Sequence, residues 1–159
     1  MILPTIVSIP KIQLIGYQLP MSFRNNRTFE LWSSFMPRKK QISNCIGSDL
    51  YCIQQYETDV KFNLDTQFIK WAAVPVKNFD SIPENMDTIT IPSGLYAVFT
   101  YKGVSSEFVS TFNYIFYEWL PNSIYQLDNR PHFEILGAKY KNNDPSSEEE
   151  VYIPIVLKK

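Results

Sequence analysis

The chain has 159 residues, of which 45% are hydrophobic and 15% aromatic, so it can bury a full core as one domain. Its 15 Lys and Arg residues nearly balance its 16 Asp and Glu residues, and the net charge of −1 gives no electrostatic basis for binding nucleic acid or an anionic membrane. No run approaches the about 18 apolar residues of a membrane span, and the N-terminus lacks the pattern of a signal peptide. We therefore expect a cytoplasmic protein that binds neither nucleic acid nor a membrane directly.

The first half of the chain has the pattern of a strand, a helix and two further strands. Residues 6–19 are rich in β-branched and aromatic side chains and predict a strand with an irregularity near Gly16. The next apolar residues recur every three or four positions, which predicts an amphipathic helix that Pro37 ends. This stripe consists of Phe29, Trp32, Phe35 and Met36. Residues 49–56 and 67–76 then predict two paired strands.

The second half repeats this order after a polar connection at residues 77–91, which we expect at the surface. Residues 94–101 predict a strand, and a broad apolar stripe predicts a helix over residues 105–120. The stripe consists of Phe108, Phe112, Ile115, Phe116 and Trp119. Residues 131–137 and 151–157 predict two more strands.

These elements predict an α+β fold in a single domain over residues 1–159. Two pseudo-symmetric β-α-β-β repeats cover about residues 1–76 and 92–157, and residues 77–91 connect them. We expect one antiparallel sheet with both helices on one face, because each half has one helix to cover one face of its strands. The opposite, concave face then holds a central ligand groove.

Glu134 is an acid in the middle of the apolar, aromatic strand at residues 131–137. Successive side chains of a strand point to opposite faces, so Phe133 and Ile135 face one way and Glu134 the other. If Phe133 and Ile135 pack under the second helix, Glu134 points into the groove and awaits a positively charged partner. A solvated surface position is the alternative, in which Glu134 has no role in binding.

The sequence indicates no metal site and no cofactor. It has a single histidine, His132, and two cysteines, Cys45 and Cys52, without further ligands at metal-binding spacing. We expect both thiols to stay reduced, as is usual in the cytosol. His132 is expected at the rim or surface rather than as a catalytic base.

Five short pieces of the second half, in this order and spacing, resemble the GyrI-like small-molecule-binding family. They are IPSGLYAVF at residues 91–99, KG at 102–103, WLPNS at 119–123, FE at 133–134 and VYIPI at 151–155. The first half agrees more loosely through FIKWAAV at residues 68–74. The family includes the effector-binding domains of multidrug-responsive transcription regulators.

This resemblance implies two β-α-β-β units around a central groove, in which the acid at the position of Glu134 pairs with cationic or polar aromatic ligands. The regulators carry a DNA-binding segment before this domain. Here the domain begins within ten residues of Met1, so we expect a stand-alone member that is not a transcription factor by itself.

We interpret the chain as a binding protein for amphipathic, cationic aromatic small molecules, with Glu134 as counter-charge. The candidate ligand-binding residues are Glu134, Tyr152, Trp71, Tyr51, Tyr96 and Trp119. Strand alternation favours a groove position for Tyr152, and the face of Trp71 and Tyr51 depends on the register. The helical spacing of Trp119 favours core packing instead.

Two other functions remain open at this stage. Some GyrI-like proteins are hydrolases that open strained rings of toxic small molecules, and Glu134 with a raised pKa could act there as the acid or base. Against this, the sequence shows no nucleophile, oxyanion motif or second carboxylate near Glu134. A protein partner is the other possibility, because one family member inhibits DNA gyrase. Its expected signature is an acidic strip, and only Glu148–Glu150 cluster, in a polar loop at residues 141–150 that we expect to be solvated.

Overall fold

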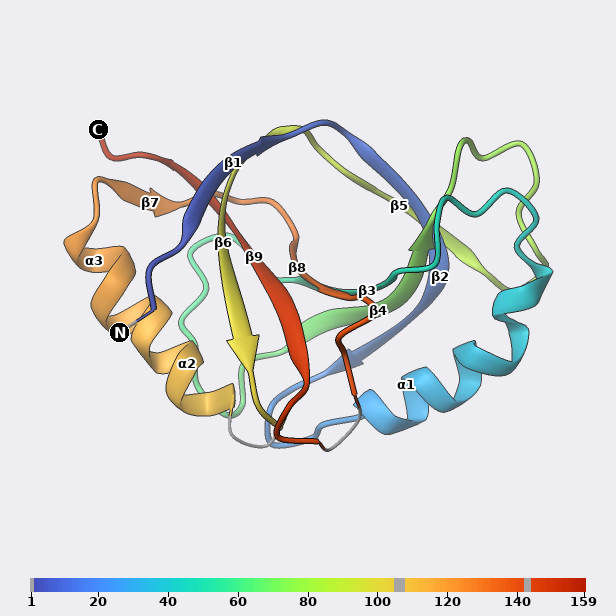
Figure 1. Ribbon diagram of the computed structural model, residues 1–159, viewed down its shortest axis with the longest axis horizontal. Coiled ribbons are helices and arrows are strands. Elements are labelled where there is room, and N and C mark those ends of the chain that lie inside the picture. Colours follow the sequence, from blue (N-terminus) through green and yellow to red (C-terminus); the bar gives the residue numbers. More distant parts are fainter. Residues whose placement is uncertain (1, 105–107, 142–143) are drawn as a thin grey trace.

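The computed structural model describes residues 2–104, 108–141 and 144–159 and combines one large antiparallel sheet with two helical regions (Figure 1). The first half contains β1 (Thr5–Ile9), β2 (Ile12–Met21), α1 (Thr28–Phe35), the 3₁₀ helix η1 (Met36–Gln41), β3 (Leu50–Gln55) and β4 (Phe68–Pro75). The second half contains β5 (Asp87–Ile91), β6 (Gly94–Lys102), α2 (Phe108–Tyr114), the π-helical turn η3 (Ile115–Trp119), α3 (Leu120–Asn122), β7 (Tyr125–Leu127), β8 (His132–Leu136) and β9 (Glu148–Leu157). The predicted α+β class is confirmed.

The strands join in the order β1-β6-β9-β8-β3-β4-β2-β5, and β7 pairs with β9. The order is symmetric about the central β8–β3 pair, since β9 and β6 follow β8 as β4 and β2 follow β3. The halves are also linked at the ends of the sheet, where β1 pairs with β6 and β2 with β5. The central pair therefore lies where residues of both halves meet.

One strand lies within the segment that was predicted to be a surface connection, so that prediction is wrong in part. β5 occupies residues 87–91 and pairs with β2 from Ile12 opposite Ile91 to Gly16 opposite Asp87. Ile89 and Ile91 are buried, whereas Thr88 and Thr90 are exposed. This is the alternation of a half-buried strand, which the polar composition of the segment concealed.

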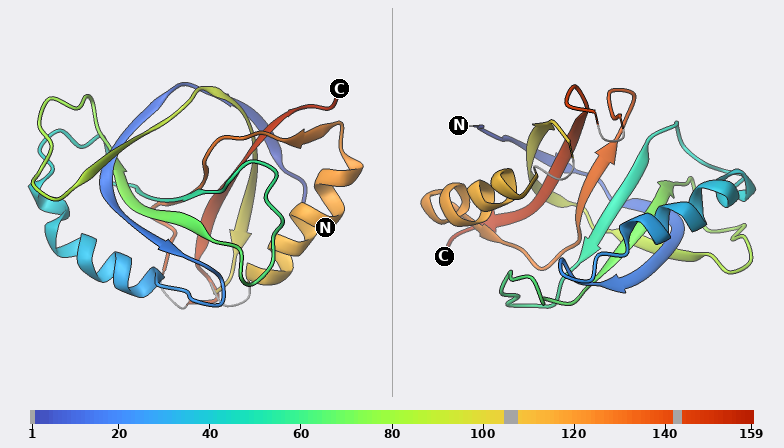
Figure 2. Two further views of the ribbon diagram at one scale, coloured as in Figure 1. Left: turned by 180° about the vertical axis from the view of Figure 1, so that it is seen from behind. Right: turned by 90° about the horizontal axis from the view of Figure 1, so that it is seen from below.

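Both helical regions cover the same face of the sheet, as expected (Figure 1). α1 packs on β2 and β4 in a core where its Phe35 joins Ile15 of β2 and Val74 of β4. α2 and η3 pack over a second core of β6 and β9 residues that includes Phe99 and Ile153. Seen from below, α1 and α2 lie apart, with the central strands crossing between them (Figure 2, right).

On the opposite face of the sheet, the central side chains form a packed core, and the expected groove there stays a prediction. β1 and β2 are separated only by residues 10–11, and β5 and β6 only by residues 92–93. β1 and β2 therefore form one nearly continuous bent strand, and β5 and β6 form another. These two bent strands arch over the concave face (Figure 1). Beneath them Tyr96 is 0% exposed, Phe133 1% and Trp71 3%. The arch therefore buries the side chains that an open groove would leave exposed.

Gly16 is required by close strand packing rather than by a break in the strand. It lies inside β2, opposite Ala73 of β4. A Cβ atom at Gly16 would lie 2.0 Å from the carbonyl oxygen of Ala72 and 2.7 Å from the Cα atom of Ala73. These are backbone atoms of a paired strand, so they cannot move aside. We expect Gly16→Ala to lower the free energy of unfolding by about 3 kcal/mol, which is the upper end of the usual cost of overpacking. Urea denaturation measures this loss.

Gly137→Ala is the matched control for this substitution. Its Cβ atom would meet the side-chain oxygen of Asp49 at 3.2 Å, and a side chain can rotate away. A loss below about 1 kcal/mol is expected. Equal losses in both variants would contradict the assignment of the Gly16 effect to backbone contact.

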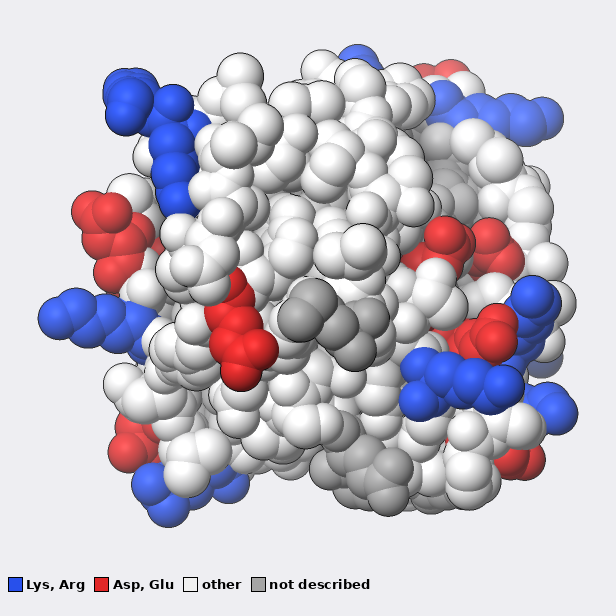
Figure 3. All heavy atoms as spheres, turned by 60° about the vertical axis from the view of Figure 1, so that its left-hand side comes forward, with Lys and Arg blue, Asp and Glu red and all other residues white. Residues whose placement is uncertain are grey.

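Charged side chains do not form a single-sign area on the side that carries α2, α3 and both chain ends. Figure 3 shows bases and acids around the margins of this face and a broad uncharged area between them. Ile124, between α3 and β7, and Leu157, at the end of β9, are exposed. Within the described residues, no helix combines the length and apolar character needed to cross a membrane.

Candidate ligand site

Glu134 lies in the middle of β8 and faces the helices. In the antiparallel register it is opposite Cys52 of β3 and Val151 of β9. Directly opposite residues share a face, and Val151 belongs to the core under α2. The expectation that Phe133 and Ile135 pack under the second helix is therefore wrong, because both belong to the core of the opposite face. Glu134 instead faces the boundary between the two helix-covered cores.

The carboxylate of Glu134 is held by a buried amide. Gln54 of β3 donates a hydrogen bond from Nε2 to Oε2 of Glu134 over 2.8 Å. Burial raises the pKa of Glu134, and the nearby charge of Lys70 and the hydrogen bond from Gln54 oppose this rise. Lys70 of β4 donates from Nζ to Oγ1 of Thr28 at the start of α1 over 2.9 Å. Lys70 thus links β4 to the start of α1, and its charge acts on the nearby Glu134.

A second acid, Glu149, lies on the same face of the neighbouring strand β9. It precedes Val151 by two residues and pairs with Tyr101 of β6, so it lies diagonally from Glu134 across the β8–β9 pair. Burial raises the pKa of Glu149 to about 8, and the charge of Glu134 adds to the rise while Lys70 opposes it. We call Glu134 and Glu149 the acid pair.

Sequence reasoning assigned Glu149 to a solvated loop, and this is wrong. β9 begins at Glu148, not at Val151, because the preceding residues continue the pairing with β6. A signal was present in the sequence. The residues on this face of the strand alternate in one unbroken series, Glu149, Val151, Ile153 and Ile155.

Aromatic side chains cover the boundary beside the acid pair. Phe62, on the connection between β3 and β4, has its ring centroid 4.9 Å from that of Tyr56, 5.4 Å from Phe112 and 4.7 Å from Phe116. We call these four residues the aromatic cover. His132 of β8 also contacts it, at 4.8 Å from Tyr56.

His132 is buried, not at the rim as expected, with 5% of its surface exposed. Burial lowers its pKa to about 3, so the imidazole is neutral at physiological pH. Its ring also stacks on Phe116 at 5.9 Å. His132 therefore contributes a flat, uncharged surface next to Glu134.

This arrangement suits an organic cation. A carboxylate in an apolar setting gains most from a partner that neutralises it, and aromatic rings attract cations through their faces. Within residues 2–104, 108–141 and 144–159, no group of three or more His, Cys, Asp or Glu side chains is placed to hold a metal ion.

The family of integron-associated effector binding proteins, Cass2, matches residues 5–155. The chain belongs to this family. The resemblance to the GyrI-like effector-binding proteins is thereby confirmed.

Three proteins illustrate the relationship of this Cass2-family chain to known proteins. Transcriptional regulator BrlR of Pseudomonas aeruginosa is 25% identical over 156 residues, which are 94% of this chain and 54% of BrlR, so the chain spans about half of that relative. SAV2435, solved with bound tetraphenylphosphonium, has a TM-score of 0.71 at 16% identity, with 96% of this chain and 93% of SAV2435 covered. An integron cassette protein of Vibrio cholerae has a TM-score of 0.70 at 15% identity, with coverages of 97% and 96%. At such identities the two structures show a shared fold.

The structure of this Cass2-family protein brings together four of the six residues predicted to form the site, but separates them from Glu134 and Trp119. Four of them lie in the core of the face opposite the helices, namely Tyr51, Trp71, Tyr96 and Tyr152. Trp119 packs on the helix-covered core, 5.2 Å from the ring of Phe99. Glu134 faces the helices. The cause is alternation, because Phe133 stacks on Tyr152 at 4.4 Å and Glu134 must then point the other way.

The polar atoms of the buried candidates have partners within the protein. The Tyr96 hydroxyl donates to the carbonyl oxygen of Pro131 over 2.8 Å, and its ring lies 4.6 Å from the guanidinium of Arg130. Trp71 donates from Nε1 to Oε1 of Gln55 over 2.7 Å. Buried Tyr and Trp side chains with such partners are stable core residues.

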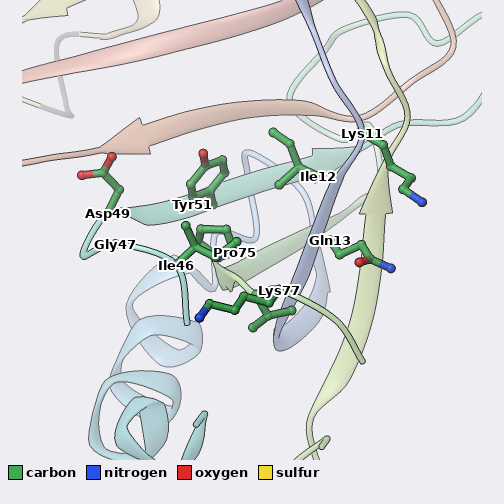
Figure 4. Close-up of a pocket in the computed structure, with 10 residues that line it drawn as sticks. Lys11, Ile12, Gln13, Ile46, Gly47, Asp49, Tyr51, Pro75 and Lys77 are labelled. Atoms are coloured by element: carbon green, nitrogen blue, oxygen red, sulfur yellow. The ribbon is translucent and has the colours of Figure 1, made fainter. Parts of the chain in front are cut away.

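Of the six, only Tyr51 lines a pocket of about 470 Å³, which lies between the start of β2, the end of β4 and the segment that leads into β3. Figure 4 shows its ring beside Ile12 and Pro75, with the amino group of Lys11 directed away from it. The charged residues of this pocket are Lys11, Lys77 and Asp49. Two bases against one acid favour an anion or a neutral molecule over a cation.

Proposed function

We propose that this protein binds amphipathic cationic aromatic molecules between its two helical regions, with Glu134 as the counter-charge. The observation that carries the proposal is the partly buried Glu134 carboxylate, hydrogen-bonded to Gln54 and adjacent to the aromatic cover. The membership in an effector-binding family supports a small-molecule ligand. Tetraphenylphosphonium, the molecule bound to SAV2435, is both cationic and aromatic and supports this ligand class.

In the structure, the protein's own side chains supply the two features of such a ligand, a positive charge and an aromatic ring. Lys70 supplies a positive charge near Glu134. Phe62 supplies an aromatic ring among Tyr56, Phe112 and Phe116. A ligand therefore has to move Phe62, which lies on a connection between strands rather than on a strand. Such connections move at lower cost than paired strands.

Phe62→Ala is expected to tighten tetraphenylphosphonium binding by about tenfold, or about 1.4 kcal/mol, because the ligand no longer has to displace a packed ring. Isothermal titration calorimetry measures the change. Leu64→Ala, an exposed residue on the same connection, is the control and should leave affinity unchanged. Weaker binding by Phe62→Ala would make Phe62 a ligand contact and not a cover.

The proposal itself is tested by titrating the purified protein with tetraphenylphosphonium and with neutral triphenylphosphine oxide, following tryptophan fluorescence. Trp32 of α1 is a suitable reporter, since it lies close to Cys52, the residue opposite Glu134 on β3. We expect saturable binding that prefers the cation. Equal affinity for both probes, or no binding of either, would contradict the proposal.

Hydrolysis of a bound electrophile is the second candidate function, and Glu149 is the observation that favours it. The sequence alone indicated no second carboxylate near Glu134, whereas the structure places one there. A carboxyl group with a pKa of about 8 can serve as general acid near neutral pH. Mass spectrometry of recovered ligands separates the two functions, since a hydrolase returns an electrophilic ligand with one water added and a binding protein returns it intact.

A further inference from the structure

We propose that Glu149 is a second ligand-facing acid, that Glu134 and Glu149 share one proton while no ligand is bound, and that a lipophilic cation expels this proton on binding. The inference rests on the proposed function. It assigns to Glu149 a role in ligand selection. It also predicts that the affinity for permanently charged cations depends on pH, whereas the affinity for neutral molecules does not.

The geometry provides two acids for one cation. Glu134 and Glu149 lie diagonally on one face of adjacent strands. Among the described residues, Lys70 is the cation whose charge acts on both acids. Lys139, the first base after β8, forms an ion pair with Glu148 over 3.5 Å instead. With both acids ionised, one buried negative charge has no partner, which is costly away from water.

A shared proton removes this excess charge. The raised pKa values of Glu134 and Glu149, caused first by burial, are in keeping with one acid being protonated near neutral pH. The two carboxyl groups then carry a single charge against Lys70. The resting site is neutral, and a neutral aromatic ligand can enter without any proton leaving.

Among the described residues, the other groups facing the acid pair whose pKa values are shifted do not change charge in the same range. Burial raises the pKa of the Cys52 thiol on β3 to about 12 and raises that of Tyr56 as well. Burial lowers the pKa of His132 on β8 to about 3. The contributions of α1 and α2 are uncharged, Thr28 and Trp32 from α1 and aromatic rings from α2. Proton release between about pH 5 and about pH 9 therefore comes from the acid pair.

The direction of the pH effect follows from charge. A bound cation supplies the missing partner for the second carboxylate, so it lowers the pKa of the acid pair below its ligand-free value. At a pH between the pKa of the ligand-bound acid pair and that of the ligand-free acid pair, binding releases one proton. The association constant then rises up to tenfold for each pH unit, because each pH unit makes proton removal about 1.4 kcal/mol easier. Above about pH 8, where the free acid pair is already ionised, the affinity levels off.

The experiment is calorimetric titration with tetraphenylphosphonium, whose charge does not depend on pH, between about pH 6 and about pH 9. Parallel titrations in two buffers of different ionisation enthalpy give the number of protons released. The wild type should release close to one proton near neutral pH. Glu149→Gln should release none and lose the rise in affinity with pH, whereas Glu149→Asp, which keeps the carboxyl group, should retain both.

Glu150→Gln is the matched control, because Glu150 is the next residue of β9, is exposed, and pairs with Ile135 on the other face. It should behave as the wild type. Proton release that persists in Glu149→Gln, or cation binding by the wild type without proton release, would overturn the role of Glu149 and leave cation binding intact. No tetraphenylphosphonium binding by any variant at any pH would overturn the proposed function as well.

Discussion

Phe133→Ala is expected to lower the free energy of unfolding by about 3–5 kcal/mol, the usual cost of deleting a buried aromatic ring. Phe133 is 1% exposed and lies at the centre of the core opposite the helices. Its ring centroid is 4.4 Å from that of Tyr152, 5.2 Å from Tyr96 and 5.6 Å from Tyr51. Removal of the ring leaves three aromatic side chains without a common partner. Urea denaturation followed by circular dichroism measures the loss.

Phe29→Ala is the control for this prediction. Phe29 lies on α1 but is 87% exposed, so its removal should change the free energy of unfolding by less than about 0.5 kcal/mol. The comparison also distinguishes the two faces of the sheet. A loss below about 1 kcal/mol in Phe133→Ala would mean that the face opposite the helices is loosely packed and able to admit a ligand.

Glu134→Gln is expected to weaken tetraphenylphosphonium binding by tenfold or more, since charged hydrogen-bonding partners contribute about 1.5–3 kcal/mol. Neutral triphenylphosphine oxide should lose less than about twofold. Glutamine has the same shape, and its carbonyl oxygen can still accept the hydrogen bond from Gln54. Because burial already disfavours the Glu134 charge, the variant should fold at least as stably as the wild type. Calorimetry and thermal unfolding measure both quantities.

Asp49→Asn provides the matched control on the other side of the protein. Asp49 is the acid of the pocket beside Tyr51 and directly precedes β3 (Figure 4). We expect unchanged affinity for both probes. Cation binding that depends on Asp49 and not on Glu134 would move the site to that pocket, and equal losses for cation and neutral probe in Glu134→Gln would exclude a charge-pairing role.

Periodicity in the sequence predicted the helices and most strands, but not which residues of each element are buried. The first helical stripe was predicted to include Phe29, whereas α1 buries Leu31 and Phe35. Both patterns have helical spacing, and only the sheet beneath the helix decides between them. For the second helix, the predicted start at Ser105 lies outside the described residues, and the apolar residues Ile115 and Phe116 are buried as predicted.

The candidate site was predictable in its chemistry but not in its location. Alternation correctly separated Glu134 from Phe133, because that depends only on local strand geometry. Whether Glu134 or Phe133 points towards the helices depends on the β3–β8 and β8–β9 pairings. These pairings join residues that are separated in the sequence. Glu149 was missed for a similar reason. Three successive acids look like a solvated loop until the pairing of Glu149 with Tyr101 brings them into the sheet.

The most direct measurement is a crystal structure of the protein with tetraphenylphosphonium. We expect the phosphonium within contact distance of the Glu134 carboxylate, with its phenyl rings in the place of Phe62 and the residues around Phe133 unchanged. The ligand in the pocket beside Tyr51, with the hydrogen bond between Gln54 and Glu134 intact and Phe62 in place, would contradict the site between the helices.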